Sequence, residues 1–133
     1  MQPDLLATKA WLLDKLKDQD IVVVDARSRK EYLGEDVRSK RGGHIPGAVN
    51  INWVLNITED NSKTFLSEVE LSELYNSYGV PKDKEAVTLC QTGVRGAHTY
   101  FVLRLLGYPK IRLYDGSWEE WGNAPDTPVQ TGD

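Results

Sequence analysis

Cysteine is almost absent from this chain of 133 residues, which contains a single one, Cys90. One cysteine cannot form an internal disulfide, and a lone thiol fits a reducing compartment, so we expect a cytoplasmic protein. The N-terminus agrees, because it lacks the basic start and the apolar core of a secretory signal. A dithiol cycle within the chain is also excluded, so transfer chemistry at Cys90 would need any second thiol from elsewhere.

Long apolar runs and an excess of basic residues are absent as well. No apolar stretch approaches the roughly 20 residues that a membrane-spanning helix needs. The chain has 16 Lys and Arg against 20 Asp and Glu, a formal net charge of -4 and a pI of about 5.2. This acidity argues against a nucleic acid or an anionic membrane as the main partner. Two histidines and one cysteine, dispersed along the chain, are a poor set of metal ligands, so no metal site is expected.

The sequence does contain the pattern of one α/β domain. Hydrophobic residues make up 40%, and a chain of this length can bury a core without disulfides or metals. Strands are expected within 21–25, 43–52, 86–90 and 111–114, and helices within 8–18, from Ser67 to Gly79 and within 95–106. The last of these helices is apolar nearly all round, so we expect it to be buried.

The segments between these elements carry fewer structural signals. Residues 27–41 are locally basic in an acidic chain, and they could either steer an anionic ligand or form a plain solvated loop. Residues 55–66 and those after Trp121 are expected to be irregular. The alternation of strands and helices nevertheless predicts an α/β fold with a mainly parallel central sheet flanked by helices.

Polar residues stand at the ends of three expected strands. Asp25 and Cys90 each end one strand, and Asp115 follows another. The carboxyl ends of parallel strands share one edge of the sheet, where the ligands of such proteins usually bind. These residues are therefore expected to gather at one rim of the domain.

The loop after Cys90 consists of Gln91, Thr92, Gly93, Val94 and Arg95. Gly93 permits a tight curl, in which successive backbone N–H groups point inward and form an anion nest. The start of the next helix and Arg95 add positive charge, and such surroundings stabilise a thiolate, the nucleophilic form of cysteine. The stretch thus predicts a reactive cysteine in an anion-binding cradle. From spacing alone, a small buried cysteine at a strand end accounts for it about equally well.

Three segments, in a fixed order, resemble the signatures of the rhodanese family of sulfurtransferases. They are VVVDAR at 22–27, GHIPGAVNINW at 43–53, and CQTGVR at 90–95 followed by YDGSWEEWG at 114–122. The resemblance covers nearly the whole chain and looks most like the catalytic half of tandem-domain thiosulfate and mercaptopyruvate sulfurtransferases. It implies a three-layer rhodanese-like fold and a single rhodanese-like domain over residues 1–133.

The resemblance also implies a sulfur-transfer cycle on Cys90. The thiolate attacks the outer sulfur of a small donor such as thiosulfate or mercaptopyruvate, and a persulfide forms. Cyanide, another thiol or a sulfur-accepting protein then takes this sulfur. The hydrogen-bond donors and positive field of the cradle suit a persulfide anion, and the cycle needs no metal and no organic cofactor.

Two rival functions stay open beside sulfur transfer. One is a persulfide carrier or protein-interaction module, since the chain is short and has no second thiol. The other is a phosphatase or arsenate reductase of the same fold, but those loops have one more residue between cysteine and arginine than the four found here. Vertebrate thiosulfate-using members have basic residues where this chain has Gln91 and Thr92, and an arginine where it has Glu31. Arg95 at the end of the loop still favours thiosulfate over mercaptopyruvate.

Three residues outside the loop, Asp25, Arg27 and Trp118, are candidates for supporting roles. Asp25 and Arg27 could pair and brace the site, or form a structural pair that never meets substrate. Trp118 could wall the pocket and exclude water, or pack in the core. His44 is interpreted as a structural turn residue rather than a general base.

Overall fold

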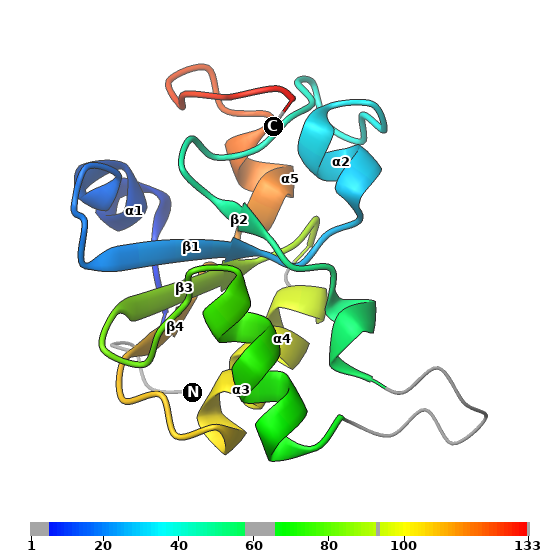
Figure 1. The fold of residues 1–133 in the computed structure, drawn as a ribbon. Coiled ribbons are helices and arrows are strands. Elements are labelled where there is room, and N and C mark those ends of the chain that lie inside the picture. Colours follow the sequence, from blue (N-terminus) through cyan, green and yellow to red (C-terminus); the bar gives the residue numbers. More distant parts are fainter. Residues whose placement is uncertain (1–5, 58–65, 93, 133) are drawn as a thin grey trace.

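A parallel four-stranded sheet forms the centre of the molecule (Figure 1). The computed structural model describes residues 6–57, 66–92 and 94–132, with Val94 described by its backbone only. The strands are β1 (Ile21–Asp25), β2 (Val49–Asn50), β3 (Glu85–Leu89) and β4 (Ile111–Leu113), and their spatial order is β2-β1-β3-β4. All neighbouring strands pair in parallel, so the predicted α/β fold with a parallel sheet is confirmed.

Helices cover both faces of this sheet and make the expected three layers (Figure 1). The helices are α1 (Lys9–Lys15), α2 (Arg29–Leu33), α3 (Glu68–Ser77), α4 (Val94–Leu105) and α5 (Ser117–Trp121), with a 3-10 turn η2 at Trp53–Asn56. One face of the sheet packs against α3 and α4, and the other packs against α1, α2 and α5. Strand β1 shows why, because Val22 and Val24 belong to the first core and Val23 to the second. Apolar residues on both sides of a strand are typical of a buried parallel sheet.

Local signals in the sequence set several of these boundaries. The Thr8 hydroxyl caps α1 by accepting a hydrogen bond from the Trp11 backbone N–H. Ser67 and Glu70 form the predicted capping box at the start of α3. Gly79 follows the end of this helix with a φ of 80°, a conformation that glycine adopts without strain.

Three features differ from the expectations. Helix α2 lies inside the basic stretch 27–41, where it starts with a second capping box between Ser28 and Glu31. Helix α5 follows β4, where no helix was expected. Helix α4 is not buried all round, since Phe101 and Leu105 are 52% and 54% exposed. It packs on the sheet with one side only, so an apolar sequence was a poor guide to its burial.

The remaining segments have little regular structure. Residues 122–132 contain no helix or named strand, as expected, although Gln130 forms an isolated antiparallel bridge with His44. Most of the expected loop 55–66 lies outside the described residues, and η2 occupies its start. Within the described ranges, every helix is too short or too polar to cross a membrane.

Candidate functional site

Cys90 follows β3 directly, at the carboxyl edge of the sheet, and its backbone is held by the start of α5. The Cys90 N–H donates to the Ser117 hydroxyl at 3.1 Å, and the Cys90 carbonyl accepts from the Trp118 N–H at 2.8 Å. The next carbonyl, of Gln91, accepts from the Glu119 N–H, also at 2.8 Å. Cys90 is 1% exposed in this arrangement. Helix α5, which sequence reasoning missed, therefore fixes the first half of the loop.

Ser117 adopts an unusual backbone conformation to make this contact. Its φ is 52°, and among the described residues it is the one non-glycine with a positive φ. Its hydroxyl also donates to the Tyr114 carbonyl at 2.9 Å, so it links the end of β4 to the backbone of Cys90. A non-glycine in this region costs on the order of 1 kcal/mol, and such strain clusters at functional sites. A positive φ at a serine has no sequence signal that could have revealed it.

Helix α4 begins close against the end of β3, because Gly96 has no side chain. A Cβ at this position would lie 3.0 Å from two backbone atoms of Leu89 and 3.3 Å from the Cys90 nitrogen. The Gly96 carbonyl also accepts a hydrogen bond from the buried Thr88 hydroxyl at 2.9 Å. The first turn of α4 is thus set directly beside the backbone that carries the thiol.

The rest of the predicted loop is only partly described. Gln91 donates its side-chain N–H to the Ser39 hydroxyl at 3.1 Å, and its side-chain oxygen is buried without a hydrogen-bond partner among the described residues. Thr92 is exposed. Gly93 lies outside the described residues, and Val94 begins α4. The anion nest expected from these residues therefore stays a prediction.

Arg95 lies in the first turn of α4 and pairs with Glu31 of α2. The two guanidinium nitrogens donate to the two carboxylate oxygens at 3.0 and 3.2 Å. Burial would lower the pKa of Arg95, but Glu31 and the nearby Cys90 sulfur outweigh this and raise it. Burial would likewise raise the pKa of Glu31, but the hydrogen bonds from Arg95 and Ser28 lower it to about 2. Both partners are therefore charged at neutral pH, beside the thiol.

A second ion pair, between Asp25 and Arg27, lies deeper in the same edge. Arg27 donates to the Asp25 carboxylate at 2.9 and 2.7 Å and to the Gly43 carbonyl at 2.7 Å. Its guanidinium lies 4.5 Å from the centre of the Trp118 ring. The Trp118 backbone N–H donates to the Cys90 carbonyl. The ion pair therefore supports the loop through its contact with Trp118. Trp118 is 1% exposed, so its ring packs in the core and does not line an open pocket.

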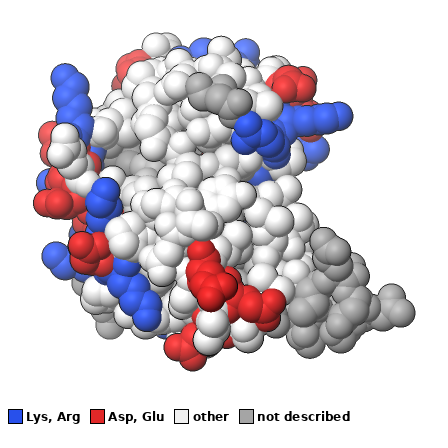
Figure 2. Space-filling model, in the orientation of Figure 1, with Lys and Arg blue, Asp and Glu red and all other residues white. Residues whose placement is uncertain are grey.

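Two further residues near the end of the basic stretch, Arg41 and His44, have structural contacts. The Arg41 guanidinium donates to the carbonyls of Trp121, Ala124 and Thr127, so it binds the C-terminal segment to the rest of the fold. His44 is buried, stacks on Tyr32 and lies with Nδ1 2.8 Å from the Tyr32 carbonyl, which agrees with a structural residue. In Figure 2, Lys and Arg lie among Asp and Glu over α2 and along the side of α1, whereas the patch over α3 is acidic.

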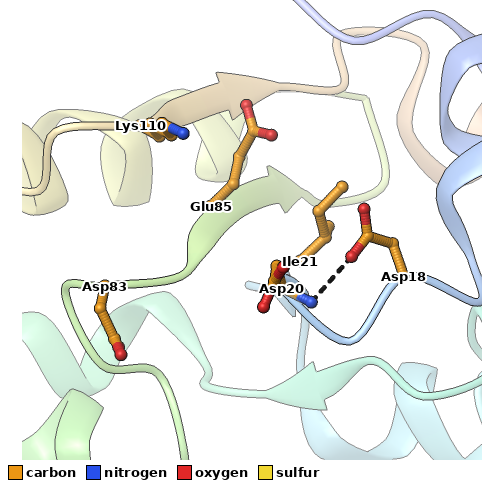
Figure 3. Close-up of a pocket in the computed structure, with 6 residues that line it drawn as sticks. All are labelled: Asp18, Asp20, Ile21, Asp83, Glu85 and Lys110. Atoms are coloured by element: carbon orange, nitrogen blue, oxygen red, sulfur yellow. Dashed lines mark hydrogen bonds between the residues drawn. The ribbon is translucent and has the colours of Figure 1, made fainter.

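The opposite edge of the sheet presents a different chemistry (Figure 3). A pocket there is lined by Asp18, Asp20, Ile21, Asp83, Glu85 and Lys110. Ile21 and Glu85 are the first residues of β1 and β3, so this pocket lies at the amino ends of the strands, away from Cys90. Its mainly acidic lining would repel an anionic ligand. In the part of the chain that the structure describes, no group of three His, Cys, Asp or Glu is placed to hold a metal ion.

Comparisons with known proteins point to one family. The profile described as "Rhodanese-like domain" matches residues 8–124. A thiosulfate sulfurtransferase of Azotobacter vinelandii is 44% identical over 124 residues, which cover 93% of this chain and 45% of that protein. A sulfur carrier protein of Thermus thermophilus is 43% identical over 128 residues, covering 90% of this chain and 44% of that one. The chain thus spans less than half the length of these curated relatives.

Solved structures give the same picture. The anaerobic ergothioneine biosynthesis enzyme of Chlorobium limicola, in complex with trimethyl histidine, matches with a TM-score of 0.86 and 27% identity. The match covers 98% of this chain and 33% of that one. A structure of EanB described as a cysteine persulfide in a tetrahedral intermediate state with ergothioneine matches with a TM-score of 0.89 and 29% identity, over 98% of this chain and 33% of that one.

Proposed function

Because this chain belongs to the rhodanese-like domain family, we propose that it transfers a sulfane sulfur from a small donor through a persulfide on Cys90. One observation carries the proposal. The sole thiol of the chain lies at the carboxyl edge of a parallel sheet, with its backbone held by α5 and with the charged Arg95 beside it. This is the edge where parallel sheets bind ligands.

In the first half of the cycle, sulfur is transferred from the donor to Cys90. The Cys90 thiolate attacks the outer sulfur of thiosulfate, the new S–S bond forms, and the bond between the two sulfur atoms of the donor breaks. Sulfite leaves with the electron pair of the broken bond, and Cys90 holds a persulfide anion. Arg95 and the start of α4 stabilise negative charge as it moves onto the bound sulfur, because they offer N–H donors that are already in place and need no rearrangement.

In the second half of the cycle, the persulfide sulfur is transferred from Cys90 to an acceptor. A nucleophile such as cyanide attacks the outer sulfur of the persulfide, forms thiocyanate and returns the Cys90 thiolate. Because the chain has one cysteine, no internal thiol can compete for this sulfur by forming a disulfide. The persulfide therefore persists until an external acceptor arrives.

A persulfide carrier that delivers sulfur to another protein is the second candidate. The Thermus thermophilus relative, itself a sulfur carrier protein at 43% identity, favours it. Both candidates use the same persulfide and differ in the acceptor. The carrier would discharge slowly to cyanide and small thiols and quickly to its protein partner.

Mass spectrometry after treatment with thiosulfate tests the shared step. We expect the intact protein to gain the mass of one sulfur atom on Cys90, and Cys90→Ser to gain nothing. Thiocyanate formation with cyanide then separates the candidates, since an enzyme turns over many times and a carrier discharges slowly. Sulfur transfer by Cys90→Ser at the wild-type rate would overturn the mechanism.

A further inference from the structure

Glu31 places a buried negative charge beside the proposed sulfur site. Its side chain is 1% exposed and accepts hydrogen bonds from the Ser28 N–H and hydroxyl at 3.2 and 2.9 Å. The same carboxylate receives both donors of Arg95, and the Arg38 side chain lies 3.7 Å away. Glu31 therefore has a double role in the fold, as the third residue of α2 that completes the capping box and as the partner of Arg95.

The ion pair changes what Arg95 offers to an incoming anion. An unpaired guanidinium beside Cys90 would contribute a full positive charge to the site. With Glu31 bound to it in a two-pronged geometry, the two charges largely cancel at the distance of a ligand, and Arg95 contributes mainly directed N–H groups. The cancellation persists at neutral pH, because the carboxylate does not take up a proton there.

We propose that Glu31 is a specificity-determining residue, whose buried carboxylate cancels the charge of Arg95 and so reduces the preference of the site for doubly charged sulfur donors. This inference rests on the proposed sulfur transfer. The physical reason is that the interaction between a fixed charge and a ligand is proportional to the charge of the ligand. The carboxylate therefore disfavours a dianion twice as strongly as a monoanion of the same shape.

Two donors that differ in charge test the proposal. Thiosulfate is a dianion and leaves as sulfite, whereas methanethiosulfonate is a monoanion and leaves as methanesulfinate. Both deliver the same sulfur to Cys90, and their differences in shape and leaving group are the same in every variant. The change in the ratio of their kcat/KM values from wild type to variant therefore reports the effect of donor charge. Glu31→Gln removes the charge and keeps the capping box, since glutamine is also favoured at this position. Glu73→Gln, on the exposed side of α3, is the matched control for the loss of one negative charge.

The pair can also be neutralised from its other side. Arg95→Gln takes away the guanidinium of the pair but leaves Ser28 and Arg38 beside the Glu31 carboxylate. The double variant Glu31→Gln/Arg95→Gln again has no net charge in the pair. We expect the ratio of thiosulfate to methanethiosulfonate to rise between about three- and tenfold in Glu31→Gln and to fall in Arg95→Gln. It should return near the wild-type value in the double variant and stay unchanged in Glu73→Gln.

Opposite shifts in the two single variants are the decisive result. If the carboxylate only supports the fold, its loss should lower the kcat/KM values for both donors by the same factor and leave their ratio constant. That outcome overturns the proposal. If Glu31→Gln fails to fold, Arg95→Gln against the double variant still measures the charge effect. If neither donor loads sulfur onto wild-type Cys90, the proposed function itself is wrong. A normal persulfide with a constant ratio would refute only the role of Glu31.

Discussion

The two ion pairs at the carboxyl edge of the sheet look alike but differ in one respect. Asp25 and Glu31 are both buried carboxylates, and each binds an arginine through two nitrogens. Arg27 is 1% exposed and is enclosed by Gly43 and the Trp118 ring, whereas the Arg95 side chain is 25% exposed and lies near the Cys90 sulfur. The exposure of the guanidinium therefore separates a pair that supports the fold from a pair that can meet a ligand.

The largest effect is expected from breaking the enclosed pair. Arg27→Met leaves the Asp25 carboxylate buried without its partner, which should lower the free energy of unfolding by about 3 to 5 kcal/mol. Chemical denaturation followed by far-UV circular dichroism measures it. A fully apolar double variant, Asp25→Leu/Arg27→Met, should recover part of the loss because it leaves no unpaired charge. A loss below about 1 kcal/mol for the single variant would mean that the pair is not a brace.

The same substitution at the exposed pair should affect rate more than stability. Arg95→Met removes the charged donor beside the thiol, and we expect persulfide formation from thiosulfate to slow by about 10². The loss of stability should be smaller than for Arg27→Met, because Ser28 and Arg38 remain beside the Glu31 carboxylate. Stopped-flow detection of sulfite release gives the rate. Equal rates of sulfite release in wild type and variant would show that Arg95 does not contribute to persulfide formation.

The smallest effect is the response of the second pair to acid. The pKa of Glu31 is lowered to about 2 from a usual value of 4.5, so its carboxylate stabilises the fold fully above about pH 4.5 and loses this contribution as the pH falls toward 2. The contribution is at most about 3 kcal/mol. Unfolding of wild type and Glu31→Gln at a series of pH values should therefore give curves that converge as the pH falls. Curves that stay parallel between pH 5 and about 2 would contradict the pairing.

The strands and most of the helices could be predicted because their sequence signals are local. Four consecutive β-branched residues marked β1, and Ser67 with Glu70 marked the start of α3. Helix α2 has the same capping signal at Ser28 and Glu31, but it is short and lies in a charged stretch without an apolar period. Without an apolar period, a capping signal alone does not predict a helix, so α2 could not be expected from the sequence.

The site was harder to predict because its contacts join distant parts of the chain. Glu31 and Arg95 are 64 residues apart, and Glu31 entered the sequence analysis only as a departure from the family pattern. The contact between Ser117 and the Cys90 backbone spans 27 residues and depends on a positive φ that serine rarely adopts. Spacing could locate the thiol, but only tertiary packing determines which charges lie beside it.

The C-terminal segment has a consequence for where this domain ends. The family profile stops at residue 124, yet Gln130 exchanges two backbone hydrogen bonds with His44, and the Gly132 N–H donates to the Leu33 carbonyl. A Cβ at Gly43 would collide with the Gln130 carbonyl oxygen, so the two segments are in tight contact. A protein shortened to residue 124 would leave the turn between α2 and β2 exposed to solvent. A domain boundary taken from family similarity alone would therefore remove the residues that pack against Gly43, whose carbonyl accepts a hydrogen bond from Arg27.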